Sequence, residues 1–327
     1  MKVIIFSHES DIDGMGSIVL GKLAFGNIDY ELAPNPKPME LIFRKYLEES
    51  KLYDYDYIFV TDLALENPSL DMVYKDEKLN KKVFVFDHHQ KAIDLELNKY
   101  NFTFIEEIDN NGKKRCATEI FYEYLLNNNY IKRKESIDTF VEFTRLEDTW
   151  DWKKENNTKA HDLAILFNKI GINNYIDRMV NKLKNNDSFM YDKEELELIN
   201  EKKKEYEDRI KEFVDVSELF IDENDNKYGI TYAPYEFRND IPEYIRNNNI
   251  NDIDYFITVA LDKEKYGQKS YRSIKDFDVN KVAMKYNGGG HPSASAVSIT
   301  KEQRENIKNM SKKEGLYYLA NSSYENI

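Results

Sequence analysis

Three short apolar runs each end in side chains that can bind metal ions or move protons. The run at 83–86 leads into Asp87, His88 and His89, although the chain has only five histidines. The runs at 3–6 and 57–60 are followed by the remaining members of the set: His8, Asp11, Asp13 and Asp62. Mixed imidazole and carboxylate ligands suit Mn²⁺, Zn²⁺ or iron better than Ca²⁺, which prefers oxygen alone. We therefore interpret the set as a metal centre.

The spacing of the carboxylates indicates two ions rather than one. Asp11 and Asp13 are one residue apart, so in an extended turn they can face the same way and reach different ions. Asp62 follows a neighbouring strand, and its two oxygens can bridge both ions. Two divalent ions about 3.5–4 Å apart can activate water and stabilise in-line attack on phosphorus. The predicted chemistry is hydrolysis of a phosphate ester.

Each of these residues has a simpler interpretation when it is taken alone. An aspartate after a strand, such as Asp62 ahead of Pro68, is typical of a turn or a helix cap. His8 alone would be typical of a buried, hydrogen-bonded histidine. Three strand ends that all carry ligand-type side chains favour the metal centre, with Asp87 as the orienting partner of His88.

The apolar runs are predicted strands of a parallel sheet, because helical patterns alternate with them. In open sheets of this kind, ligands bind at the carboxyl ends of the strands, where the histidines and aspartates lie. Strands are expected at 2–7, 57–60, 83–86 and 102–105. Helices are expected at 14–25, 39–47, 68–74, 117–126, 136–146, 161–168 and 175–183, with a polar loop at 153–159.

A second α/β pattern follows a stretch rich in Glu and Lys at 194–214, which reads as a solvated helix with paired charges or as a connector. Strands are expected at 219–221, 228–232, 255–261, 270–274 and 296–299, with a helix at 279–286. We place a first domain at 1–185, a helical linker at 186–215 and a smaller domain at 216–327.

Composition narrows the function classes. A net charge of −13 argues against stable binding of long nucleic acid, which usually needs a basic surface. The sequence has no apolar run near the ~20 residues that span a bilayer, and its one cysteine, Cys116, allows no intrachain disulfide. A cytoplasmic protein without membrane contact is expected, and its tyrosine-rich surface could support a homodimer.

Three further features have two interpretations each. Asp148, within Glu147–Trp152, can complete the second metal site or lie in a turn with the tryptophans as core. Three consecutive glycines before His291 favour close backbone contact with a ligand over a plain turn. Arg272 can bind phosphate or be a surface cation.

The chain resembles the DHH phosphoesterase superfamily in the order and spacing of these motifs. His8 with residues 11–17 (DIDGMGS) resembles the first motif, and Asp62, the Asp87–His89 run and Asp148 resemble the second, third and fourth. Residues 288–296 (GGGHPSASA) resemble the glycine-rich signature of the DHHA1 domain. The resemblance implies a parallel-sheet DHH domain with helices on both faces, joined by a helical linker to a smaller α/β DHHA1 domain.

The resemblance also implies roles for the residues. One ion, most often Mn²⁺ in the family, would be bound by His8, Asp11 and Asp62, and the other by Asp13, Asp62, His88 and Asp148. The spacing from His8 to Asp11 departs from that of many relatives, so His8 is the ligand that the resemblance supports least. Asp87 would orient a neighbouring residue of the site without binding an ion, and His89 would contact the substrate phosphate. Substrate would be held by Arg272, Gly288, Gly289, Gly290 and His291.

Within the superfamily the chain is most similar to the nano-RNase B type of oligoribonuclease, which implies hydrolysis of short RNA to mononucleotides. Two other activities would suit the same centre: a 3′-phosphoadenosine 5′-phosphate phosphatase and a cyclic or linear dinucleotide phosphodiesterase. A nucleotide-sensing module is the alternative from another class. It would be expected to lack a ligand, and none is missing from the sequence.

Overall fold

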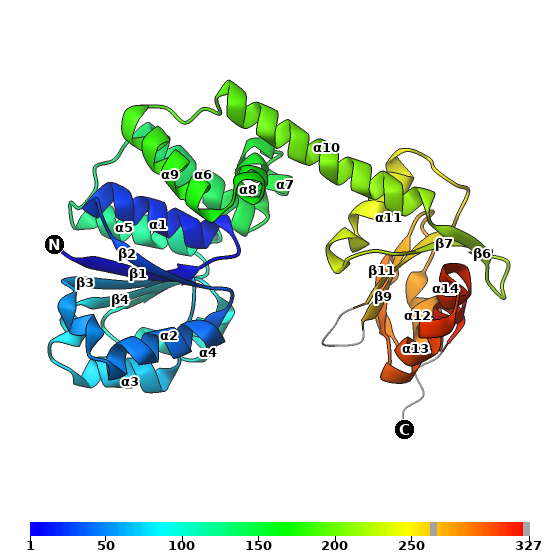
Figure 1. The fold of residues 1–327 in the computed structure, drawn as a ribbon, viewed down its shortest axis with the longest axis horizontal. Helices are drawn as coiled ribbons and strands as arrows, with labels where there is room; N and C mark the ends of the chain where they lie inside the picture. The colour runs from blue at the N-terminus through cyan, green and yellow to red at the C-terminus, as the bar shows by residue number, and fades with distance from the viewer. Residues whose placement is uncertain (262–266, 323–327) are drawn as a thin grey trace. The chain divides into compact units, whose positions relative to one another are not determined.

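The computed structural model describes residues 1–261 and 267–322, which fall into two compact units, Met1–Lys202 and Lys203–Ile327. Each unit has its own sheet (Figure 1). The predicted fold class is confirmed: the first unit holds a parallel sheet of five strands, and the second, smaller unit holds a sheet of six strands covered by helices. No helix within the described ranges is long and apolar enough to cross a membrane.

The first sheet has the strand order β2-β1-β3-β4-β5, and all its neighbours are parallel. In this order the direction of winding changes between β1 and β3, and such a change creates a crevice at the carboxyl ends of the strands. The strands are β1 (Val3–His8), β2 (Asp29–Ala33), β3 (Tyr57–Thr61), β4 (Val83–Asp87) and β5 (Thr103–Ile105). The edge strand β2 was not predicted, because its first four residues are partly or fully exposed and two of them are acidic.

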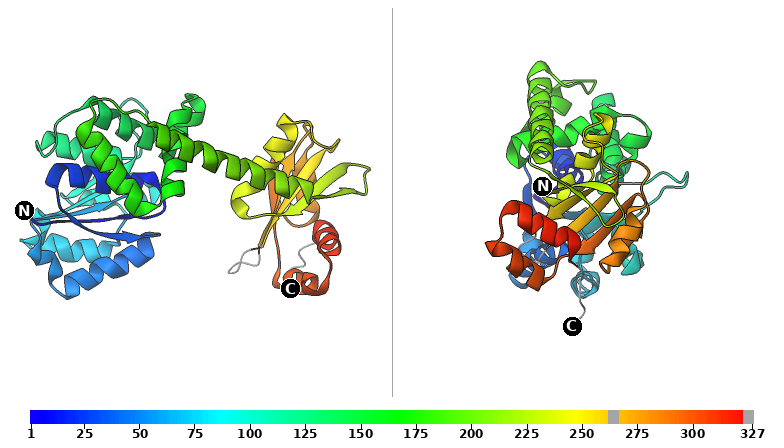
Figure 2. Two further views of the ribbon diagram at one scale, coloured as in Figure 1. Left: turned by 45° about the horizontal axis from the view of Figure 1, so that its top comes forward. Right: turned by 90° about the vertical axis from the view of Figure 1, so that its right-hand side faces the viewer.

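Helices cover both faces of this sheet, which explains why its inner strands contain runs of consecutive apolar residues. Ile5 and Phe59 pack into the core on one face, while Ile4 and Val60 pack into the core on the other. One face carries α1 (Ile12–Phe25), α5 (Ala117–Asn127), α6 (Glu135–Asp148), α8 (Thr158–Ile170) and α9 (Ile172–Asn185). The opposite face carries α2 (Pro36–Glu48), α3 (Asn67–Lys75) and α4 (Gln90–Asp94), as Figures 1 and 2 show.

The predicted loop at 153–159 is wrong for most of its length. The short helix α7 (Asp151–Lys154) occupies its start, and α8 begins at Thr158, so only 155–157 lies outside helices. Beyond α9, the 23-residue helix α10 (Lys193–Asp215) begins in the first unit and ends in the second. We propose that α10 forms the core of the linker at 186–215.

The second sheet is mixed, with the order β10-β11-β9-β8-β7-β6 and one parallel pair, β7 with β8. Helices α12 and α14 cover one of its faces, while α11 and the end of α10 pack over the other. Its strands are β6 (Glu218–Ile221), β7 (Lys227–Tyr232), β8 (Tyr255–Ala260), β9 (Gln268–Ser273), β10 (Gly289–His291) and β11 (Ala294–Ser298). Its helices are η4 (a 3₁₀ turn, Tyr235–Arg238), α11 (Asp240–Asn247), α12 (Val279–Lys285), α13 (Lys301–Asn306) and α14 (Lys312–Asn321).

Candidate metal centre

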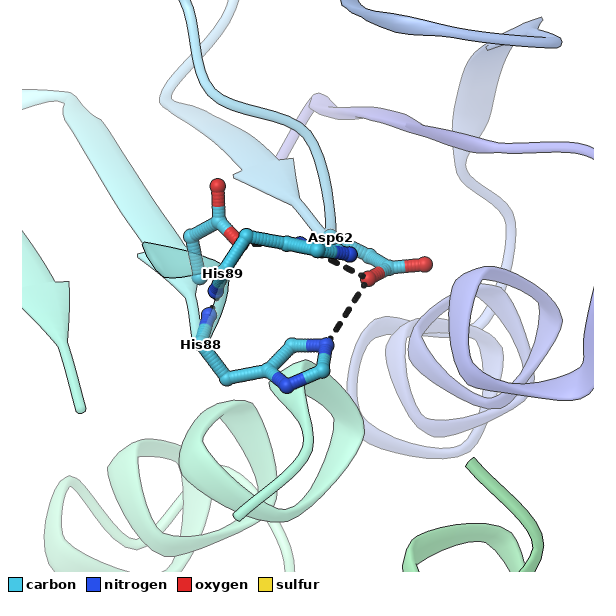
Figure 3. Close-up of side chains that lie close together, drawn as sticks. Asp62, His88 and His89 are labelled. Atoms are coloured by element: carbon cyan, nitrogen blue, oxygen red, sulfur yellow. Dashed lines mark hydrogen bonds and ion pairs between the residues drawn. The ribbon is translucent and has the colours of Figure 1, made fainter. Parts of the chain in front are cut away.

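The carboxyl edge of the parallel sheet brings the predicted ligands together. His8 is the last residue of β1, Asp62 directly follows β3, and Asp87 ends β4 ahead of His88 and His89. Figure 3 shows the ring of His88 pointing toward the carboxylate of Asp62, with His89 beside them. Candidate ligand atoms fall into three groups within 4.8 Å: Asp62, Asp87, His88 and His89; His8, Asp11 and Asp62; and Asp13, His88 and Asp148.

His8 presents one ring nitrogen to two carboxylates. Its Nδ1 lies 2.6 Å from Asp11 Oδ2 and 3.5 Å from Asp62 Oδ2. Its Nε2 lies 3.0 Å from the carbonyl oxygen of Pro34, which can only accept, so Nε2 carries a hydrogen. The hydrogen bond to Asp11 and the nearby carboxylate of Asp62 raise the pKa of His8 to about 11. A cation bound between these carboxylates would take the place of the Nδ1 proton.

Asp11 is also fixed by the start of helix α1. Its Oδ1 accepts a hydrogen bond of 3.0 Å from the Gly14 amide, so the carboxylate caps the helix while Oδ2 faces His8. Gly14 makes this arrangement possible, because a Cβ there would lie 2.0 Å from the carbonyl oxygen of His8. Burial opposes ionisation of Asp11, but its hydrogen bond with His8 keeps its pKa below the usual value.

The third group, Asp13, His88 and Asp148, is centred on His88. The His88 Nε2 lies 3.6 Å from Asp13 Oδ2 and 3.5 Å from Asp148 Oδ2. Asp13 is fully buried, and its two oxygens accept 2.8 Å hydrogen bonds from the amides of Ala117 and Thr118 at the start of α5. Sequence reasoning missed these two donors, because they lie more than 100 residues from Asp13 and contribute only backbone atoms.

Asp148 is the last residue of α6, and the structure brings it into this group rather than into a separate turn. Burial and the nearby Asp13 raise the pKa of its carboxyl to about 8. Trp150, which the alternative interpretation placed in the core, is 62% exposed. For His88, burial favours the neutral ring, but Asp13 and Asp148 outweigh it and raise the pKa.

Asp62 belongs to two of the three groups and lies within 4 Å of the rings of His8, His88 and His89. Its side chain is almost fully buried, and its Oδ1 lies 3.5 Å from His88 Nε2. It does not cap the next helix, since Glu66 holds that position ahead of α3. Its backbone is in the left-handed region (φ 62°), which aspartate tolerates better than most residues. Burial and repulsion from Asp13 raise its pKa well above the usual value.

Asp87 orients His89 and not His88, so that detail of the sequence interpretation is wrong. Its Oδ1 accepts hydrogen bonds from the amides of His88 (2.7 Å) and His89 (3.1 Å) and from Nδ1 of His89 (2.7 Å). The Asp87 hydrogen bond raises the pKa of His89. The His89 side chain is 52% exposed, so its ring is open to a bound ligand.

Several buried polar atoms at this edge have no hydrogen-bond partner among the described residues, a condition that is rare in folded proteins. They are both carboxylate oxygens of Asp62, Oδ2 of Asp87, Nε2 of His88 and Oδ2 of Asp148. Leaving such atoms unpaired in the interior costs free energy, and cations among them would remove that cost. The donor set of imidazole nitrogens and carboxylate oxygens therefore fits divalent metal ions.

The predicted substrate-binding residues lie in the second unit. Arg272 on β9 and His291 on β10 both pair with Ala294 on β11, so the three side chains share one face of the sheet. Gly289 and His291 are exposed, and a Cβ on Gly289 would meet nothing within 4 Å. Gly288 is instead packed tightly, since a Cβ there would lie 2.3 Å from the carbonyl oxygen of Ala296.

Comparison with known proteins identifies relatives. The DHH family N-terminal domain matches residues 2–143, and the DHHA1 domain matches residues 239–314. The chain is 31% identical over 307 residues to oligoribonuclease NrnB of Bacillus subtilis (strain 168), covering 92% of this chain and 74% of that protein.

Two solved structures cover almost the whole chain. The DHH domain of a protein assigned to a family of ribosomal proteins superposes with a TM-score of 0.52 at 12% identity, over 99% of this chain and 87% of the other. A pGpG-specific phosphodiesterase from Vibrio cholerae gives a TM-score of 0.48 at 14% identity, over 98% and 100% of the two chains. The first likeness supports the fold.

Proposed function

The chain belongs to the DHH family of phosphoesterases and is a hydrolase, and from this premise we propose that it hydrolyses short RNA oligonucleotides to mononucleotides with two divalent metal ions. The observation that carries the proposal is that the Asp62 carboxylate lies 3.5 Å from both His8 and His88, each of which belongs to one of the two candidate ligand groups that would hold an ion. The activity named for the relative from Bacillus subtilis, an oligoribonuclease, supports RNA as the substrate.

The proposed ligands form two sets that share one carboxylate: His8, Asp11 and Asp62 for one ion, and Asp13, Asp62, His88 and Asp148 for the other. When bound, divalent ions such as Mn²⁺ supply charge neutralisation at phosphorus and lower the pKa of water. The chain holds its ligands in place beforehand: Pro34 fixes the ring of His8, and the start of α5 fixes Asp13.

His89 is the proposed contact to the scissile phosphate. Its Nδ1 donates to Asp87, and the half-exposed ring is free to offer its other nitrogen to a phosphate oxygen. A donor fixed in this way stabilises the negative charge that grows during attack on phosphorus. Asp87, held by two amides, keeps the ring from rotating.

The preference for short RNA follows from charge. With a net charge of −13, the chain repels a long polyanion, whereas a short oligonucleotide needs only a few cationic contacts. Arg272 and the exposed β10 strand with His291 are the proposed contacts to one end of the substrate.

A panel of substrates tests this proposal. Purified protein with Mn²⁺ would be given labelled RNAs from two residues to a long single strand, with 3′-phosphoadenosine 5′-phosphate, cyclic dinucleotide and pyrophosphate in parallel. We expect rapid loss of RNAs of two to five residues while the long strand is spared. Phosphate release from the bisphosphate alone would show a phosphatase, turnover of dinucleotides alone a dinucleotide phosphodiesterase, and binding without turnover a sensor.

A further inference from the structure

The short helix η4 carries the exposed residues Tyr235 and Glu236 and the partly buried Arg238. Its buried residue, Phe237, packs against Tyr206 and Phe213 of α10, with ring centroids 4.8 and 5.0 Å away. This anchor fixes the backbone of η4, so the neighbouring residues are held in place. Tyr235 is 50% exposed, and the guanidinium of Arg238 lies 3.9 Å from the centre of its ring.

Burial and the positive charge of Arg238 lower the pKa of Arg272. Asn239, the residue after Arg238, accepts a hydrogen bond of 2.9 Å from Nε of Arg272. Within the described part of the chain, the other hydrogen-bond acceptors of the two guanidinium groups are the backbone carbonyls of Tyr235, Tyr271 and Ser295. Two like charges are thus held together in a chain with an excess of acidic residues, an arrangement that an anion would stabilise.

The sheet register places a small residue next to Arg272. Arg272, Ala294 and His291 lie in one row across β9, β11 and β10, on the same face. The methyl group of Ala294 separates the two larger side chains, so a ligand can lie between the arginine and the imidazole. On the other side of Arg272 the row continues to Phe256, which packs in the core beneath α11 together with Phe237.

We propose that Tyr235 and Arg238 form, with Arg272, a nucleotide subsite in which the two guanidinium groups bind a phosphate and the tyrosine ring stacks on the base. Both new residues precede the DHHA1 match, which begins at residue 239. Arg238 packs on one face of the Tyr235 ring and limits its rotation. An exposed aromatic ring beside a phosphate-binding cation is typical of sites for single-stranded nucleotides. This inference depends on the proposed function only in taking a nucleotide as the ligand.

Equilibrium binding without metal tests the subsite separately from catalysis. A fluorescently labelled RNA dinucleotide would be titrated with wild-type protein in EDTA, followed by Arg238→Gln, Tyr235→Leu and Tyr235→Phe. We expect about tenfold weaker binding for Arg238→Gln and for Tyr235→Leu, while Tyr235→Phe retains binding because the ring is kept. Arg209→Gln is the matched control, since Arg209 is an exposed arginine on α10 in the same unit.

Two results would overturn the subsite: unchanged binding by both Arg238→Gln and Tyr235→Leu, or an equal loss in Arg209→Gln, which would reveal only general attraction to positive charge. Competition with inorganic phosphate and with a nucleoside separates the two halves of the site. Phosphate should compete less well against Arg238→Gln than against wild type, and the nucleoside less well against Tyr235→Leu. Because no turnover is measured, a failure of RNA hydrolysis would overturn the proposed function and leave this result standing.

Discussion

Lys269 offers a quantitative test of how the second unit is held together. It lies on β9, its side chain is fully buried, and its Nζ donates to the carbonyl oxygens of Leu319 (2.6 Å) and Ser322 (3.1 Å) at the end of α14. Burial lowers the pKa of Lys269 from 10.5 to about 8. The substitution Lys269→Met keeps the length of the side chain and removes the titrating group.

The sign of the effect follows from proton uptake. Between about pH 8 and 10.5 the unfolded chain keeps the proton on Lys269 while the folded chain has lost it, so the free energy of unfolding rises with pH. The difference between the two pKa values corresponds to a rise of about 3 kcal/mol in the free energy of unfolding across this pH range, at about 1.4 kcal/mol for each pKa unit. Between pH 7.5 and 9.5 the expected rise is about 2 kcal/mol in wild type, and Lys269→Met should lack it.

Urea unfolding followed by far-UV circular dichroism at these two pH values measures the difference. The stability of wild type relative to Lys269→Met should increase by about 2 kcal/mol from pH 7.5 to 9.5. Lys301→Met, at an exposed position on α13, is the control and should show no such change. If the stability of wild type relative to Lys269→Met were the same at both pH values, the burial of a charged lysine under α14 would be refuted.

Three further predictions concern the two sites. Asp62→Asn should lower turnover more than about 100-fold. It should also raise the thermal midpoint in EDTA by roughly 2–4 °C, because it removes a carboxylate whose ionisation is opposed by burial and by Asp13. A lower midpoint would contradict this. Asp87→Asn should reduce kcat by about 10–100-fold with little change in Mn²⁺ affinity, because the ring of His89 loses the carboxylate that orients it. Equal losses of kcat and of Mn²⁺ affinity would instead make Asp87 a metal ligand. Gly288→Ala should destabilise the protein by about 1–3 kcal/mol, because its Cβ would clash with Ala296. Gly289→Ala should leave the stability unchanged and weaken only RNA binding. Urea unfolding and RNA-binding measurements on the two variants test this.

The candidate metal centre could be located from the sequence because its residues follow a simple geometric rule. The strands at 3–6, 57–60 and 83–86 are predicted from their runs of apolar residues. Because these strands are parallel, their carboxyl ends lie at one edge of the sheet. Asp148 could be added only through the family pattern, since nothing local to the end of α6 distinguishes a ligand from a turn residue.

The parts that the sequence did not reveal depend on backbone contacts between distant segments. The missed strand β2 leads to Pro34, whose carbonyl orients His8, and the start of α5 holds Asp13. The glycines before His291 carry little strand propensity, yet Gly289–His291 pairs with β11, because register with a neighbouring strand outweighs intrinsic preference.

Turnover of a labelled RNA dinucleotide by metal-stripped protein, with Mn²⁺ added back in steps, tests the two-metal proposal most directly. We predict no hydrolysis in EDTA, recovery that requires two ions per chain, and no recovery in Asp62→Asn, because the carboxylate shared by both ligand sets is lost. Hydrolysis by the metal-stripped protein, or full recovery in Asp62→Asn, would contradict the proposal.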